Sequence, residues 1–148
     1  MGSSSMIKLL FTLAIVVLTS FLPRNPVAVP IKRSDPDRTY VYIYNELDLG
    51  PTLTVHCWSK DDDLGEQDLP PKFSWEFSFG LDFLGRTRFV CTFKWDDEVH
   101  KFPIYVQSRD DYDCLKCNWT ISQAGPCRWK SASESVCYHW EDGAKTFN

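Results

Sequence analysis

The stretch FSWEFSF, residues 73–79, places an aromatic residue at every second position, with serine or glutamate between them. Successive side chains of a β-strand point to opposite faces of the sheet. This segment therefore predicts a strand with one buried aromatic face and one solvated face. Residues 89–95, FVCTFKW, repeat the pattern with phenylalanine, cysteine and tryptophan on the inward side.

The same period of two extends outward from these segments in both directions. Residues 40–44, YVYIY, are aromatic and β-branched throughout, which favours a strand. Alternation continues at residues 53–57, 100–106 and 117–121, and short strands are expected around 127–129 and 136–140. Pro103 predicts that its strand lies at a sheet edge, because proline cannot donate to a neighbouring strand.

These patterns predict an all-β fold, an antiparallel β-sandwich of about seven to eight strands. Half-polar strands favour antiparallel pairing with one solvated face, and many short strands separated by turns are typical of sandwiches. Six Trp, six Tyr and ten Phe supply enough apolar surface for a core. No cofactor is needed to complete such a core, and none is expected.

The chain has six cysteines, an even number. In an oxidising compartment this predicts a disulfide-braced domain whose pairing the sequence leaves open among 15 connectivities. The six are Cys57, Cys91, Cys114, Cys117, Cys127 and Cys137.

Cys114 and Cys117 form a C-x-x-C motif, which in other proteins can be a redox dithiol or half of a zinc site. A redox motif normally opens a helix in a βαβ unit, and a zinc site needs a second pair of ligands. Neither context is visible here. We expect instead that the two cysteines join different, distant partners.

The N-terminus predicts secretion. Lys8 precedes an apolar run of about 10–14 residues that ends before Pro23 and Pro26, the layout of a signal peptide. The run is shorter than the ~20 residues of a spanning helix, so membrane insertion is not expected. We assign residues 1–28 to the signal peptide, with cleavage between about 20 and 30. An extended lead-in (29–38) and a single domain (39–148) follow.

The charge balance narrows the class of partner. Without Lys8 and Arg24, 14 basic residues remain against 20 acidic ones, a net charge of −6. This excess argues against nucleic acid, whose phosphates require a basic face, and disfavours an anionic membrane surface. The oligomeric state is left open.

The sequon Asn118-Trp119-Thr120 predicts N-glycosylation in a secreted chain. Trp119 is expected to point inward from its strand. Asn118 and Thr120 would then face solvent, where a glycan could attach.

Two further groups of residues carry side chains that could bind a metal ion or transfer protons. Residues 60–66, KDDDLGE, could offer oxygen ligands to calcium, but they do not match an EF-hand loop and are equally typical of a turn. His56 and His100 lie on different predicted strands and could meet in a hydrolase or ribonuclease site. No supporting catalytic arrangement accompanies them, and we do not expect an enzyme.

Several motifs, taken in order, resemble the plant self-incompatibility protein homologues, the secreted proteins related to the poppy stigma self-incompatibility protein. They are residues 41–47 (VYIYNEL), 53–65 (LTVHCWSKDDDLG), 75–79 (WEFSF), 91–95 (CTFKW), 114–121 (CLKCNWTI) and 125–127 (GPC). The resemblance covers roughly residues 39–130. It implies a secreted, non-enzymatic β-sandwich with Trp75, Trp95 and Trp119 in its core.

The resemblance also implies a signalling or recognition role, with a membrane receptor or another extracellular protein as partner. Binding residues concentrate on loops carried by rigid scaffolds, and the candidate loops are residues 60–71, 80–86 and 107–113. The last provides a candidate recognition set of Arg109, Asp110, Asp111, Tyr112 and Asp113. The alternative is binding of cell-wall carbohydrate, which an exposed pair among Trp58, Trp129 and Trp140 would favour.

Overall fold

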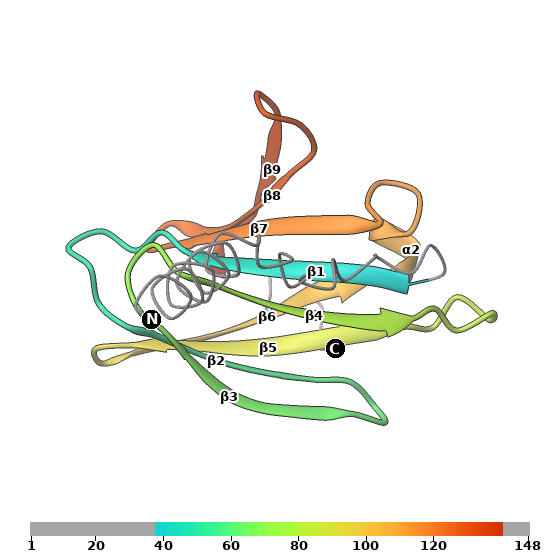
Figure 1. Cartoon of the computed structure of the whole chain (residues 1–148), viewed down its shortest axis with the longest axis horizontal. Helices are drawn as coiled ribbons and strands as arrows, with labels where there is room; N and C mark the ends of the chain where they lie inside the picture. Colours follow the sequence, from blue (N-terminus) through green and yellow to red (C-terminus); the bar gives the residue numbers. More distant parts are fainter. Residues whose placement is uncertain (1–37, 141–148) are drawn as a thin grey trace, which may run out of the picture. The chain divides into compact units, whose positions relative to one another are not determined.

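The computed structural model describes residues 38–140, which form nine strands and one short helix (Figure 1). The predicted signal peptide and most of the predicted lead-in lie outside the described residues. The elements are β1 (Arg38–Asn45), β2 (Leu53–Trp58), β3 (Asp63–Leu69), β4 (Ser74–Gly80), β5 (Arg88–Trp95), β6 (Glu98–Val106), α2 (Gln107–Asp110), β7 (Lys116–Ser122), β8 (Gly125–Trp129) and β9 (Ser135–Cys137).

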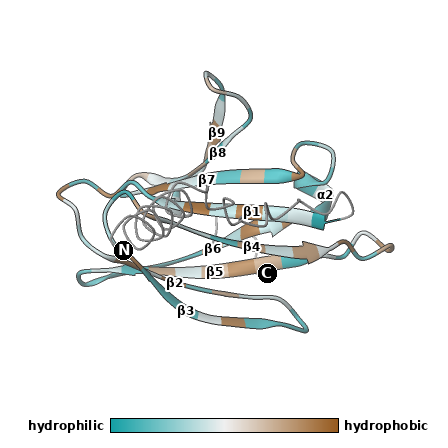
Figure 2. Ribbon diagram, in the orientation of Figure 1, coloured by the Kyte–Doolittle hydropathy of each residue, from teal (hydrophilic) through white to brown (hydrophobic). Residues whose placement is uncertain are grey.

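The strands form two sheets that pack face to face. One has five strands in the order β4-β1-β7-β8-β9, and the other has four in the order β3-β2-β5-β6. Hydrophobic and hydrophilic residues alternate along β1 and β7 (Figure 2). The all-β sandwich is therefore confirmed.

An aromatic layer fills the space between the sheets. Trp119 of β7 packs edge-on against Phe102 of the opposite sheet, with ring centroids 5.5 Å apart. Phe79 of β4 contacts Phe89 and Tyr105 of the opposite sheet at 4.5 and 4.8 Å. Trp119 and Trp95 are buried as expected, whereas Trp75 is only partly buried at the margin of the core. Burial raises the pKa of Tyr105 to about 12.

Three details differ from the sequence prediction. First, β1 and β7 pair in parallel, although all the other pairs are antiparallel. Second, residues 63–69 form strand β3, where a loop had been expected; this strand carries mainly polar residues, so alternation gave no signal. Third, Phe73 is exposed because β4 begins only at Ser74.

Among the strands that the structure describes, β6 pairs only with β5, so the predicted edge position of residues 100–106 is confirmed. Pro103 lies in a β-bulge of β6, where the register with β5 shifts between Phe89 and Cys91. The missing backbone donor of proline is thereby placed at an irregularity of the ladder.

All six cysteines are paired; two disulfides each join neighbouring strands of one sheet, and the third joins a loop to the strand that follows it. Cys57 joins Cys91 between β2 and β5, and Cys127 joins Cys137 between β8 and β9. Cys114 joins Cys117 across three positions. The prediction that these two cysteines have different, distant partners is therefore wrong. Aromatic packing, with no disulfide between them, holds the two sheets together.

Candidate functional site: the Tyr112 end of the sandwich

Strand register brings three connections to one end of the sandwich, which we call the Tyr112 end. They are residues 59–62 between β2 and β3, 81–87 between β4 and β5, and 107–115 between β6 and β7. Trp58 pairs with Val90, and Arg88 with Val106, so the neighbouring connections must lie together. In Figure 1 the last two connections extend from the same side of the sheets.

The opposite end, which we call the Leu49 end, carries residues 46–52, 70–73, 96–97 and 123–124. Leu49 lies fully exposed at the tip of the first of these connections, and its φ of 65° is left-handed. Asn45, which is buried, organises this end. Its Nδ2 donates to the carbonyls of Pro51 and Leu69, both at 2.9 Å, and its Oδ1 accepts from the Leu47 amide at 3.1 Å.

Gln107 joins two of the connections at the Tyr112 end. Its Oε1 accepts from the Thr87 amide and its Nε2 donates to the Asp82 carbonyl, each at 3.1 Å. Its own backbone amide donates to the Thr87 carbonyl at 2.9 Å. One buried side chain thus holds residues 81–87 and 107–115 as a single surface.

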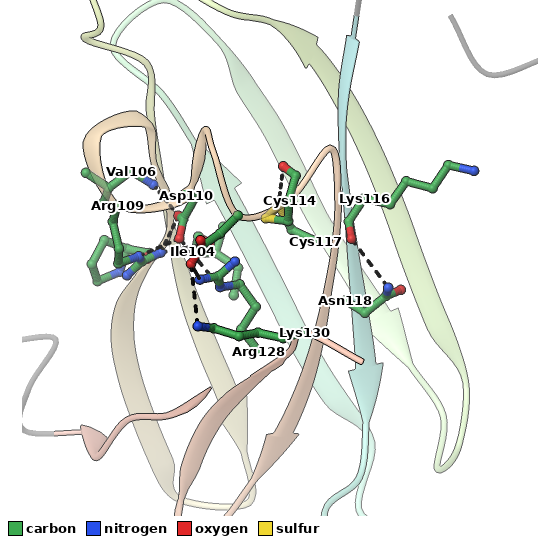
Figure 3. The surroundings of a disulfide bond; sticks show 12 residues. Ile104, Val106, Arg109, Asp110, Cys114, Lys116, Cys117, Asn118, Arg128 and Lys130 are labelled. Carbon is green, nitrogen blue, oxygen red and sulfur yellow. Dashed lines mark hydrogen bonds and ion pairs between the residues drawn. A yellow bond between two sulfur atoms is a disulfide. The ribbon is translucent and has the colours of Figure 1, made fainter. Parts of the chain in front are cut away.

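A buried ion cluster fixes the 107–115 loop to the sheets (Figure 3). Asp110 has no exposed surface. Arg109 donates to both of its carboxylate oxygens at 2.8 and 2.7 Å, and the Val106 amide donates at 2.8 Å. Arg128, from β8, approaches from the other side with its Nε 3.6 Å from Oδ1. An ionised carboxylate can remain buried when it is paired and hydrogen-bonded in this way.

The two arginines connect the cluster to other parts of the molecule: Arg109 to aromatic rings of the core, and Arg128 to the loop. The guanidinium of Arg109 lies over the rings of Phe102, Trp119 and Tyr138, 5.3–5.6 Å from their centroids. Arg128 donates to Asp113 at 2.8 Å, and this bond holds the pKa of Asp113 below its usual range. The loop is therefore fastened at both Asp110 and Asp113.

The Cys114–Cys117 disulfide closes the loop where it enters β7. Close beside it, the Cys114 amide donates to the Asp110 carbonyl and the Tyr40 amide donates to the Leu115 carbonyl, both at 2.9 Å. The ion cluster, the disulfide and these backbone bonds together fasten the loop to β6, β7 and β8.

The five candidate recognition residues separate into two groups. Asp110 lies in the interior and Arg109 is paired with it, so these two side chains position the loop. Tyr112 is 100% exposed and Asp111 is partly exposed, while Asp113 is exposed but paired with Arg128. Leu115, Phe83 and Leu84 are also exposed at this end.

A cleft of about 1070 Å³ adjoins the same end, between strands β3 and β4. Phe77, Phe79 and Phe89 lie along it, and charged residues of the 59–62 and 81–87 connections surround it. Among these, Asp82 accepts from Arg86 at 2.6 Å; this bond lowers the pKa of Asp82 and raises that of Arg86. The Tyr112 end thus combines apolar side chains with charges of both signs.

Sequence reasoning missed Gln107 and Arg128. Arg128 occupies an inward position of β8, between Cys127 and Trp129. A charged residue at an inward position would have signalled a buried ion pair, but only the strand register identifies that position as inward.

His56 and His100 do not come together in a common site. His56 of β2 pairs with Thr92, whose side chain points outward. His100 pairs with the buried Phe93 and stacks on Trp95 and Trp140. The two imidazoles therefore lie on opposite faces of one sheet. His56 contacts Asp63 instead, at 2.7 Å. The pKa of Asp63 is lowered by the Gly65 amide and then by His56.

Glu66, in β3, pairs with Lys94 of β5 at 3.0 Å, and Asp61 and Asp62 belong to a turn. Asp62 accepts from the hydroxyl of Ser59, whose own Oγ accepts from the amides of Asp61 and Asp62. Among residues 38–140, no group of three or more His, Cys, Asp or Glu side chains is arranged to hold a metal ion.

The three tryptophans considered for carbohydrate binding do not form an exposed pair. Trp129 is 40% exposed on the five-stranded sheet. Trp58 belongs to the other sheet, and Trp140 packs against Trp95 and Phe93 at 5.6 Å.

Trp119 points inward and Asn118 outward, the orientation expected for the sequon.

Comparison with known proteins places the sequence motifs in context. The profile of the plant self-incompatibility protein S1 family matches residues 40–140. The chain belongs to this family. S-protein homolog 2 of Arabidopsis thaliana is 40% identical over 88% of this chain and 91% of its own length. S-protein homolog 3 of the same plant is 39% identical over 72% of this chain and 75% of its own.

The motifs that resemble this family are mostly structural in this chain. Asn45 ties the Leu49 end together, Cys57 and Cys91 join neighbouring strands, and Trp119 fills the core. None of the helices in the part of the chain that the structure describes is both long and apolar enough to cross a membrane.

Proposed function

We propose that this S-protein homologue is secreted and acts as a ligand for a cell-surface receptor, which it binds through the Tyr112 end. The observation that carries the proposal is a fully exposed tyrosine on a loop fastened by a buried ion cluster and a disulfide. Aromatic residues are enriched among the contacts that dominate interface energies. Family membership and the apolar run after Lys8 support secretion.

The construction of the loop favours binding. A loop that is already ordered loses little conformational entropy when a partner binds, so more of the contact energy appears as affinity. Phe83, Leu84 and Leu115 would extend the apolar contact around Tyr112, and the charges beside the cleft would provide a polar rim. Recognition by this surface needs no catalytic group.

The test is binding of the full chain, secreted in oxidised form from plant cells, to membranes from pollen and from leaf cells. Tyr112→Ala should weaken binding tenfold or more, since removal of a dominant contact costs at least about 1.4–2 kcal/mol. Leu49→Ala is the matched control, because Leu49 is equally exposed at the opposite end. Its affinity should equal that of the wild type.

Equal affinities for the two variants would exclude the Tyr112 end as the binding surface. Both variants should keep the wild-type melting temperature, since each truncates a side chain that is exposed to solvent. A loss of binding can then be attributed to the contact itself.

A further inference from the structure

The outer face of the five-stranded sheet places aromatic rings on both sides of the sequon. Asn118 pairs with Tyr42 of β1 on one side and with Trp129 of β8 on the other. Thr120 pairs with Tyr44. A glycan at Asn118 would therefore start between aromatic side chains.

Asn118 is available to carry such a group. In Figure 3 its side chain and that of Lys116 project away from the buried ion cluster. The amide nitrogen makes one long contact, 3.4 Å from the Lys116 carbonyl. Substitution at this nitrogen would therefore disturb little of the surrounding structure.

Next to Asn118 the surface forms an open hollow of about 520 Å³. Tyr44, Thr120, Trp129 and Lys130 are among the residues that line it. The indole nitrogen of Trp129 donates to the Thr120 hydroxyl at 3.2 Å, which fixes the orientation of the exposed ring. A sugar ring placed there would lay its apolar face on an aromatic surface and leave its hydroxyls to Glu46, Lys130 and solvent.

We propose that Asn118 carries an N-linked glycan whose first N-acetylglucosamine packs into this hollow against Trp129 and Tyr44. The proposal rests on entry into the secretory pathway, which is part of the proposed function. The donor is a lipid-linked oligosaccharide. The bond between its C1 carbon and the lipid diphosphate breaks, the diphosphate leaves with the electron pair, and Asn118 Nδ2 bonds to C1 and loses one proton.

Transfer has to precede folding, because β7 lies between β1 and β8 in the finished sheet. The attached glycan then covers the outer face of this sheet and shields Trp129.

The first test is the mass of the full chain secreted from plant cells, before and after treatment with an amidase that cleaves the bond between asparagine and N-acetylglucosamine. The wild type should lose the mass of one glycan, and the cleavage should convert Asn118 to aspartate. Asn118→Gln and Thr120→Ala should be secreted without that mass, and Thr120→Ser should keep it. A wild-type chain that is secreted with unmodified Asn118 overturns the proposal while leaving secretion intact. A chain retained in the cell without a glycan would contradict both.

The second test addresses packing and uses the N-acetyl methyl resonance of the first sugar in isotopically labelled protein. Ring currents of Trp129 should move this resonance upfield of its position in the released glycan. Trp129→Ala should largely remove the shift, and Trp129→Phe should retain part of it. A resonance identical in attached and released glycans would show that the sugar extends into solvent, and would overturn the packing.

Discussion

The two ends of the sandwich each display one fully exposed apolar side chain, yet they are anchored by different chemistry. The Leu49 end depends on Asn45, a neutral amide that makes three hydrogen bonds to backbone groups. The Tyr112 end depends on a charged cluster of Asp110 and two arginines, in which Asp110 and Arg128 are buried and Arg109 is partly exposed. The first anchor closes a turn, and the second connects a loop to three strands.

The difference indicates that the ion cluster serves to orient the loop at the Tyr112 end. A buried amide with satisfied partners holds a turn at low cost, because no charge is desolvated. A buried ion cluster pays a large desolvation penalty, and apolar residues of similar volume often stabilise a fold as well or better. What the cluster adds is a fixed position for the loop that carries Tyr112. Breaking each anchor in turn tests this interpretation.

The largest effect is expected from Asp110→Asn. The substitution keeps the shape of the side chain but leaves Arg109 and Arg128 without their shared counter-charge, and removing one partner of a buried pair costs about 3–5 kcal/mol. Denaturant unfolding with the disulfides intact measures the change. Asp111→Asn is the control and should remain within about 0.5 kcal/mol of the wild type. If Asp110→Asn matched this control, the cluster would not be an anchor.

Asn45→Ala should destabilise the domain by about 1–3 kcal/mol, less than Asp110→Asn. The carbonyls of Pro51 and Leu69 and the Leu47 amide all lose a partner, and unsatisfied buried groups carry that penalty. Amide hydrogen exchange should become faster in residues 46–52 and remain unchanged in 107–115. Receptor binding through the Tyr112 end should be preserved, and its loss would show that the two ends are coupled.

Replacing both Cys114 and Cys117 by serine should cost about 2 kcal/mol, because the disulfide closes only a short loop and removes little unfolded-state entropy. Its main effect should be local. We expect faster hydrogen exchange in residues 107–115 and weaker membrane binding, with the Leu49 end unaffected. An unchanged affinity would mean that the ion cluster alone fixes Tyr112.

Asp113→Asn should have the smallest effect, and this effect should depend on pH. The pKa of Asp113 is lower than usual in the folded chain because Arg128 donates to it. Such a carboxyl stabilises the fold above its unfolded pKa and stops doing so as the pH falls through its folded value. The melting temperatures of wild type and variant should therefore differ by a constant amount from about pH 7 to 5 and converge below about pH 4. A difference that grew on acidification would contradict this assignment.

The inward residues of most strands followed from sequence because alternation is a local property. Phe79, Phe93 and Trp119 are buried at the positions that period two assigned to them. The outward orientation of Asn118 followed for the same reason. The polar strand β3 escaped prediction because its residues show no such alternation.

Pairing between distant segments could not be predicted in this way. The partner of Cys114, the parallel alignment of β1 with β7 and the burial of Asp110 all depend on which strands become neighbours. Gly125 makes the same point. Its sequence context indicates a turn, but a Cβ built at this position would lie 1.9 Å from the Tyr138 carbonyl oxygen, so the space available there is set by a segment that arrives later in the chain.

The sequence alone determined an all-β, cysteine-paired domain of this family with aromatic residues turned inward, because side-chain alternation and composition act over a few residues. The tertiary structure decided which loops share one end, which charges are buried, and that Tyr112 stands fully exposed on an anchored loop. Those features depend on register between strands far apart in the chain, and no local pattern encodes that register.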